Sequence, residues 1–240
     1  MKKIIVSELV TLDGVMEAPG GEPGHPHSGW VFDFIGDEQM QYKLEEVLEA
    51  ESLLIGRVTY ESFAGAWPER SGVFADKMNA MPKYVVSTTL RNPEWHNSTV
   101  IGADVAGAIA RLKQGEGDPI LVGGSRTLVH MLMEHDLVDE YRLMIFPVIL
   151  GSGRRLFPET PSKTVLRLVD SRPFSSGVVV HTYHPTSQSE AGWSEERLEQ
   201  ELRGGHRLLD RLARDQQEAD PLVAGPDHHL VAPVEQHQER

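Results

Sequence analysis

Short apolar runs alternate along residues 1–185 with segments in which apolar side chains recur every three or four positions. The first run, Ile4–Thr11, is rich in β-branched residues and is followed by Asp13-Gly14, a pair typical of turns. Helical spacing after Asp37 and Asp104 predicts amphipathic helices that these two residues cap. Strands are predicted over residues 4–11, 52–55, 84–87, 98–101 and 120–122, and helices from residue 37, from residue 59, and over 74–81, 104–113 and 125–134.

The pattern changes near residue 140, where three apolar runs follow one another with turns between them and no helix. These runs cover residues 140–150, 164–170 and 177–183. Strands separated by helices form right-handed crossovers in a parallel sheet, whereas strands joined by turns pair antiparallel. The sequence therefore predicts one α/β domain whose mixed, mostly parallel sheet has antiparallel C-terminal strands. Ligands of such sheets bind in loops beyond the carboxyl ends of the strands.

The composition shifts after Pro185. The first 185 residues contain 17 basic and 24 acidic side chains, and the remainder contains 6 and 12. The remainder has one aromatic residue and too little apolar surface to offset the entropy of ordering. We predict a domain over residues 1–185 and an acidic, polar C-terminal extension over 186–240. Leucines at helical spacing in 194–217, interrupted by Gly204-Gly205, leave two interpretations open: a docking or dimerising helix, and a frayed tail.

The 240 residues carry a formal net charge of −13 and include no cysteine. The lack of cysteine excludes disulfides, zinc ribbons and thiol nucleophiles, and the acidic balance disfavours general nucleic-acid binding. No apolar run approaches the roughly 18 residues of a membrane span, and the one after Lys3 is too short for a signal peptide. His25 and His27 have no third metal ligand nearby in the sequence. We therefore expect a cytoplasmic protein with a small-molecule ligand, no nucleic-acid or membrane partner, and no metal.

Three predicted strands end in turns suited to phosphate groups. The turn Gly56-Arg57-Val58-Thr59 opens a helix, whose free backbone N–H groups attract anions. Residues 123–128 combine two glycines with hydroxyls and a cation, and residues 87–89 supply further hydroxyls. Each turn alone also has a structural interpretation, because glycine is common in tight turns and arginine on surfaces. None matches a Rossmann or Walker motif, but together they predict a dinucleotide or phosphorylated ligand.

Several segments in sequence order carry a resemblance to a known family. They are VTLDGVM, IGRVTYESF, KYVVST, ILVGGSRTL and LVDEYRLMIFPVILGSGRRLF. Across residues 3–184 the chain resembles the dihydrofolate reductase superfamily, and within it the branch of the C-terminal reductase domain of bifunctional riboflavin-biosynthesis (RibD-type) enzymes. The resemblance implies a dihydrofolate reductase-like three-layer fold, NADPH as cofactor, and a homodimer.

By position, the resemblance implies that the three turns form the cofactor site. Gly56, Arg57 and Thr59 would lie at the adenosine 2′-phosphate and the pyrophosphate, with Ser87 and Thr88 on the adenosine side. The residues that would hold the diphosphate and approach the nicotinamide are Gly123, Gly124, Ser125, Arg126, Thr127 and Leu128. We expect NADP rather than NAD, because the Arg57 guanidinium can bind the 2′-phosphate bidentately.

The loop after the first strand would line the mouth of the substrate site. Its candidate substrate contacts are Leu12, Asp13 and Met16, of which Asp13 is also interpretable as a turn residue before glycine. Trp30 follows a glycine-rich loop and is interpretable as a wall that stacks on a flat ring or as an anchor of the core.

The resemblance also implies a carboxylate on the first helix if the substrate is a folate. The corresponding position here is near Met40, which is not an acid. Asp37 is the candidate substitute, although an acid at a helix start is also explained by the helix dipole. This departure argues against dihydrofolate reduction, and no proton donor is assigned from the sequence.

Two classes of function follow. The first is an NADPH-dependent reductase of a pyrimidine- or pterin-like heterocycle, nearest to the 5-amino-6-(5-phosphoribosylamino)uracil reductases. The second is a nucleotide-binding module with little turnover, whose C-terminal extension recruits a partner. Within the enzyme class, a dihydrofolate reductase is the alternative. Three phosphate-binding turns favour the enzyme, and the missing carboxylate favours the module.

Overall fold

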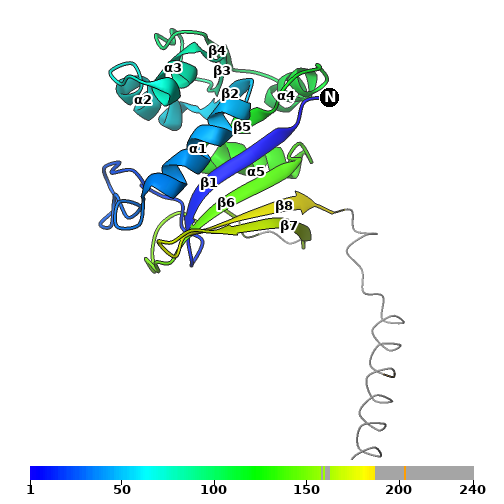
Figure 1. Ribbon diagram of the computed structural model, residues 1–240. Coiled ribbons are helices and arrows are strands. Elements are labelled where there is room, and N and C mark those ends of the chain that lie inside the picture. Colours follow the sequence, from blue (N-terminus) through cyan, green and yellow to red (C-terminus); the bar gives the residue numbers. More distant parts are fainter. Residues whose placement is uncertain (158, 160–162, 187–202, 204–240) are drawn as a thin grey trace, which may run out of the picture. The chain divides into compact units, whose positions relative to one another are not determined.

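A computed structural model describes residues 1–157, 159, 163–186 and 203 (Figure 1). The chain divides into two units, Met1–Ala191 and Gly192–Arg240. The predicted extension over 186–240 lies outside the described residues except for Thr186 and Arg203, and its two interpretations stay predictions.

The described residues form one eight-stranded sheet in the order β4-β3-β2-β5-β1-β6-β8-β7. Neighbouring strands from β4 to β6 are parallel, while β8 pairs antiparallel with both β6 and β7. The predicted mixed, mostly parallel sheet with antiparallel C-terminal strands is confirmed. The strands are β1 (Ile4–Thr11), β2 (Ser52–Gly56), β3 (Lys83–Val86), β4 (Ser98–Ile101), β5 (Ile120–Val122), β6 (Glu140–Phe146), β7 (Leu166–Pro173) and β8 (Val179–Pro185).

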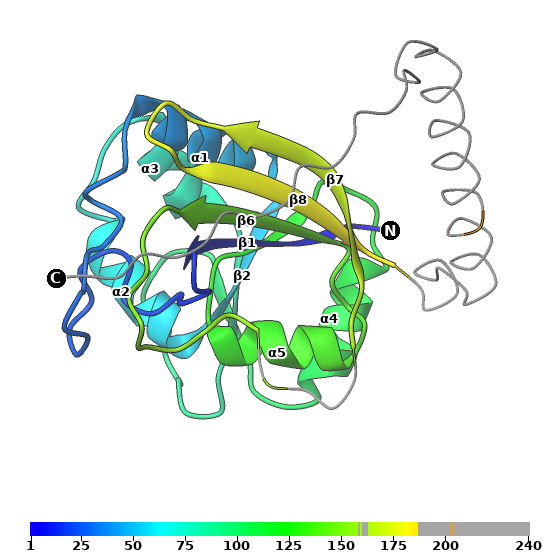
Figure 2. The ribbon, with the colours of Figure 1, turned by 90° about the horizontal axis from the view of Figure 1, so that it is seen from below.

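Helices cover both faces of the sheet, which gives three layers (Figure 2). Alternate residues of a strand face opposite sides, so Ile5 of β1 packs in the core beside α1, α2 and α3, and Val6 packs beside α4 and α5. The three-layer prediction is therefore also confirmed. The helices are α1 (Asp37–Glu49), α2 (Arg57–Ala66), α3 (Val73–Ala80), α4 (Val105–Lys113) and α5 (Arg126–Glu134).

Several element ends differ from prediction for local reasons. Asp37 does not cap α1: Gly36 does, and its backbone N–H donates to the Gln39 side chain at 3.1 Å. Helix α2 begins at Arg57, two residues before the predicted Thr59. Strand β6 ends at Phe146 rather than residue 150, because Pro147 follows and cannot donate to the ladder.

One mismatch in strand length opens the sheet. β5 pairs with β1 only at Ile4–Val6, because β5 ends at Val122 and the chain then turns into α5. β1 continues to Thr11 along β6. The edge of β1 that faces β5 is therefore unpaired beyond Val6, at the carboxyl end of the parallel strands, where α/β sheets bind ligands.

Candidate functional site

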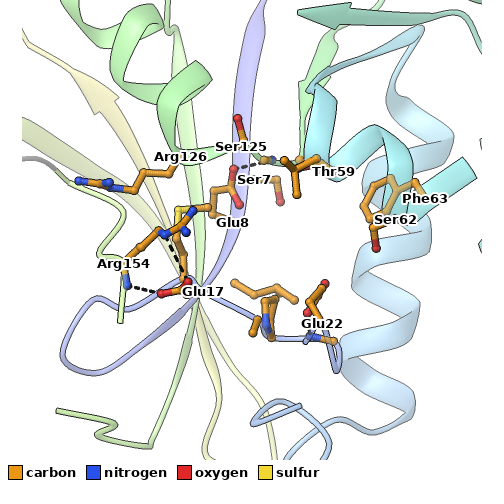
Figure 3. A pocket seen from close by; sticks show the side chains of 18 of the residues that line it. Ser7, Glu8, Glu17, Glu22, Thr59, Ser62, Phe63, Ser125, Arg126 and Arg154 are labelled. Atoms are coloured by element: carbon orange, nitrogen blue, oxygen red, sulfur yellow. Dashed lines mark hydrogen bonds and ion pairs between the residues drawn. The ribbon is translucent and has the colours of Figure 1, made fainter. Parts of the chain in front are cut away.

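A cavity of about 560 Å³ lies at this opening (Figure 3). Its walls come from β1, the segment 16–23, α1, α2, the β5–α5 turn and Arg154. Ser7 and Glu8 both line it, although consecutive strand residues face opposite sides of a sheet. The cavity therefore passes from one face of the sheet to the other around the free edge of β1. Its volume lies within the range of small-molecule and cofactor sites.

Two of the predicted phosphate turns meet at the top of this cavity. The Gly56 N–H donates to the Gly124 carbonyl at 3.3 Å, which joins the end of β2 to the β5–α5 turn. A Cβ at Gly56 would collide with the Ser125 side chain, and one at Gly124 would lie 2.7 Å from the Thr59 hydroxyl. The two turns thus approach more closely than residues with side chains would allow, and glycine at both positions has a packing reason.

The N-termini of α2 and α5 both border the cavity, through Thr59 and Ser125 respectively. Free N–H groups of a first helical turn and its partial positive charge favour an anion. Arg126 adds a cation to this wall; its Nε donates to the Arg155 carbonyl at 3.0 Å. No carboxylate in the described part of the chain forms an ion pair with Arg126. This donor set fits a diphosphate.

The family follows from comparison with known proteins. A model of the RibD C-terminal domain matches residues 2–180. The chain belongs to the RibD C-terminal domain family. The uncharacterized protein YyaP of Bacillus subtilis (strain 168) is 30% identical over 188 residues, which cover 76% of this chain and 95% of YyaP. This RibD C-terminal domain is thus related to the reductases of the riboflavin pathway.

Solved structures share the fold of this domain. A Shewanella sp. PV-4 protein provisionally named for riboflavin biosynthesis has 22% identity and a TM-score of 0.59, and the match covers 77% of this chain and 99% of that chain. The Thermotoga maritima diaminohydroxyphosphoribosylaminopyrimidine deaminase/5-amino-6-(5-phosphoribosylamino)uracil reductase has 15% identity and a TM-score of 0.54, with 77% of this chain and 57% of that chain covered. These likenesses support the predicted dihydrofolate reductase-like α/β fold.

The predicted cofactor residues of the RibD C-terminal domain fall into two groups. Those that line the cavity are Thr59, Gly123, Gly124, Ser125, Arg126 and Thr127. Gly56 does not line the cavity but contacts one of these residues, because its N–H donates to the Gly124 carbonyl. Arg57 is exposed outside the cavity, and its Nη1 pairs with Glu61 at 2.7 Å. Leu128 lies in the core with 3% exposure, which its place on the inner face of α5 requires.

The predicted adenosine-side residues follow β3. The Ser87 hydroxyl accepts the backbone N–H groups of Thr89 (3.1 Å) and Leu90 (2.9 Å), so it shapes this turn. Thr88 is exposed. Neither residue lines the cavity. Their contact with the adenosine stays a prediction, and it requires a ligand that extends past the end of β2.

Of the predicted substrate contacts, Met16 alone lines the cavity. Leu12 is exposed, and its N–H donates to the Val148 carbonyl at 3.0 Å. Trp30 is an anchor of the core: it packs edge-on against Phe146, and its Nε1 donates to the Glu17 carbonyl at 2.8 Å. Asp37 is exposed at the start of α1.

Asp13 ties two loops together. Its carboxylate accepts the Thr11 hydroxyl at 2.6 Å and the N–H groups of Leu150 and Gly151 at 3.2 and 2.9 Å. The Thr11 hydroxyl, followed by these backbone N–H groups, lowers the pKa of Asp13 below its ordinary value. The side chain that sequence reasoning preferred as a substrate contact is thus occupied by the loop that it holds in place.

Sequence reasoning missed Glu8, whose carboxyl points from β1 toward the β5–α5 turn (Figure 3). The side chain is buried, with 7% exposure of the residue, and its Oε1 accepts the Gly124 N–H at 2.7 Å. Burial raises its pKa to about 7, against the smaller lowering effects of the Gly124 N–H and Lys43. A signal was present in the sequence, because Glu8 is the one charged residue in the strand Ile4–Thr11.

A second buried acid, Glu46 of α1, lies on the other side of β1. It accepts the Ser7 hydroxyl at 2.9 Å and the Lys43 Nζ at 2.6 Å, and the Arg142 guanidinium approaches to 3.8 Å. Lys43 and Ser7 also line the cavity, whereas Glu46 does not. The charge of Glu46 is therefore compensated within the protein.

Among residues 1–157, 159, 163–186 and 203, no helix combines the length and apolar character needed to cross a lipid bilayer. Within the same ranges, no group of three histidine, cysteine or acidic side chains is arranged to hold a metal ion.

Proposed function

We propose that this RibD C-terminal domain is an NADPH-dependent reductase of a pyrimidine- or pterin-like heterocycle, nearest to the aminouracil reductases of riboflavin biosynthesis. The observation that carries the proposal is the meeting of two helix N-termini and Arg126 on one cavity that opens through the sheet. Membership of a reductase-domain family supports it.

The residues of the cavity fit a dinucleotide. The hydroxyls of Ser125 and Thr127, the N–H groups that open α5, and Arg126 would hold its diphosphate. Gly123 would admit the ligand closely, since a Cβ there would meet open space. When bound, a reduced nicotinamide supplies a hydride.

The remainder of the cavity lining combines apolar and charged side chains. Met16 and Phe63 offer apolar surface suited to a flat ring, and Lys43 and Ser7 offer polar contacts. The Arg154 side chain also lines the cavity, but it forms an ion pair with Glu17 at 3.2 Å. In the reaction these residues would orient the heterocycle and exclude water from the acceptor carbon.

A titration with NADPH and NADH, followed by cofactor fluorescence, tests the cofactor. We expect saturable binding with preference for NADPH, and oxidation of NADPH when the correct heterocycle is added. A screen should include dihydrofolate and the phosphoribosylamino-uracil. Absence of saturable NADPH binding would contradict the proposal.

Arg57 tests the preference for NADPH. We expect Arg57→Ala to weaken NADPH binding about tenfold or more through loss of a charge-assisted contact, with NADH binding unchanged. Glu61→Gln should strengthen NADPH binding, because it frees Arg57 from its present partner. Arg111→Ala, an exposed arginine on α4, is the matched control. Equal effects of Arg57→Ala on NADPH and NADH would refute the assignment of the 2′-phosphate.

One observation favours the nucleotide-binding module as a second candidate. Helix α1 contributes Lys43 to the cavity and no carboxylate, and Glu38 is instead bound to the Ser175 N–H at 2.9 Å. Tight NADPH binding without oxidation by any heterocycle in the screen would favour the module over the enzyme.

A further inference from the structure

Glu8 occupies an unusual place for an acid. Its Oε1 accepts the N–H of Gly124, which belongs to the turn proposed above to hold a diphosphate. A buried carboxylate beside a bound polyanion is unfavourable, because the low-dielectric surroundings strengthen the repulsion. Either the anion stays away from the turn, or the carboxyl loses its charge when the anion arrives.

The surroundings of Glu8 offer little to stabilise its negative charge. The second oxygen, Oε2, accepts no hydrogen bond from the described residues, and the residue lines the cavity. Lys43 favours the charged form and Glu46 opposes it, and both act from α1 without contacting Glu8. The other charged residues that line the cavity are Arg126 of α5, Glu17 and Glu22 of the segment 16–23, and Arg154.

We propose that the site binds its anionic ligand together with one proton, and that the proton is held by the Glu8 carboxyl. The neutral carboxyl removes the repulsion and keeps Oε1 as the acceptor of the Gly124 N–H. Its O–H then becomes a donor on the cavity side, available to an oxygen of the ligand. The inference rests on the proposed function, because the ligand is the diphosphate of NADPH.

The raised pKa of Glu8, about 7, allows this proton to be taken up near neutral pH. Above that pH the free protein is charged at Glu8, and binding must bring in a proton from solution. By linkage, the affinity then falls about tenfold for each further unit of pH, as long as the bound form keeps its proton. The phosphates of NADPH hold a nearly constant charge above pH 7, so they add little to this slope.

Titration calorimetry tests the proposal in the full chain. NADPH and ADP-ribose, which has the diphosphate but no nicotinamide and no 2′-phosphate, would each be titrated between pH 7 and pH 9. At pH 8, the titrations are repeated in two buffers of different ionisation enthalpy. The difference between the two binding heats gives the number of protons taken up per ligand. The variants are Glu8→Gln, which keeps the acceptor of the Gly124 N–H, and Glu17→Gln, a control acid of the same cavity whose charge Arg154 compensates.

For the wild-type protein we expect uptake of close to one proton per ligand at pH 8 and an affinity loss of about 50-fold between pH 7 and pH 9, because half of Glu8 is still protonated at pH 7. Glu8→Gln should bind with no proton uptake and an affinity that changes less than threefold, while Glu17→Gln should keep the wild-type slope. Wild-type binding without proton uptake would overturn the inference even if Glu8→Gln failed to fold. An unchanged slope in Glu8→Gln would overturn it as well.

The two proposals fail in different ways. If ADP-ribose binds with proton uptake and NADPH does not bind, the reductase proposal is wrong and the role of Glu8 stands. If NADPH binds and is oxidised with no proton uptake on binding, the reductase proposal stands and the role of Glu8 is wrong. If neither ligand binds at any pH, both are wrong.

Discussion

The two sides of β1 each hold a buried glutamate, and the surroundings of the two acids differ. Glu46, with 2% exposure, has a hydroxyl and a lysine within hydrogen-bond distance and a guanidinium at 3.8 Å. Glu8, with 7% exposure, accepts one backbone N–H from the part of the chain that the structure describes. Their burial is nearly equal, so burial alone does not separate them. The difference lies in how completely other residues compensate the charge.

This difference underlies the proposal that Glu8 responds to a ligand, whereas Glu46 serves the structure. A buried charge with ionic partners cannot be removed without leaving those partners uncompensated inside the protein. An acid with one neutral donor can gain or lose a proton at moderate cost, which suits a group that responds to a ligand. Of the two, only Glu8 lines the cavity.

The largest expected effect comes from removing the charge of Glu46. In Glu46→Gln, Lys43 loses its carboxylate and Arg142 loses one of its acidic neighbours, so we expect the free energy of unfolding to fall by about 3–5 kcal/mol. Urea denaturation of the wild-type protein and the variant measures this change in the free energy of unfolding. Glu45→Gln is the matched control: this neighbour on α1 forms an exposed, solvent-screened ion pair with Arg172, so its loss should lower the free energy of unfolding far less than Glu46→Gln does. Similar losses in both variants would remove the contrast drawn above.

Glu8→Gln should change the pH dependence of stability instead. The pKa of Glu8 is raised from 4.5 to about 7 on folding, so the folded state binds the proton more tightly. The stability contributed by that proton is fully present below pH 4.5 and is lost as the pH rises to 7. Relative to Glu8→Gln, the wild-type protein should lose about 3 kcal/mol over this interval.

Chemical denaturation of the wild-type protein and Glu8→Gln at several pH values measures this difference, and the comparison cancels groups common to both. A constant difference between pH 4.5 and 7 would show that Glu8 titrates normally.

Asp13 gives the smallest expected effect. Its carboxylate has three donors, as a compensated acid should, but it lies near the surface, where solvent screens the charge. We expect Asp13→Asn to cost about 1 kcal/mol at pH 7. Because the pKa of Asp13 is lowered on folding, this difference should be fully present above the ordinary value of 3.8 and be lost as the pH falls from there through the lower pKa of the folded state. Thermal unfolding at pH 7 and pH 3 would measure it, and a loss as large as that of Glu46→Gln would show that burial matters less than the number of donors.

Much of the fold could be predicted from the sequence because its signals are local. The bounds of β1 follow from a β-branched run and the turn after it, and both were predicted correctly. The cavity wall at residues 123–127 also follows from local chemistry, since glycines and hydroxyls after a strand mark a turn into a helix.

The remaining features of the site depend on contacts between distant residues. Glu8 meets Gly124 across 116 positions of the chain, and Asp13 meets Gly151 across 138. The inward orientation of Leu128 depends on how α5 sits on the sheet, which the motif alone does not specify. Trp30 became a core residue because Phe146, from β6, packs against it.

The shortness of β5 has a mechanical consequence. This three-residue strand stands between β2 and β1, so the hydrogen-bonded ladder linking the two halves of the sheet passes through three residue pairs on each side. Any change in twist between the β4-β3-β2 half and the β1-β6-β8-β7 half is therefore concentrated at β5. The cavity lies just beyond that strand, with walls from both halves, so its width depends directly on the angle between them.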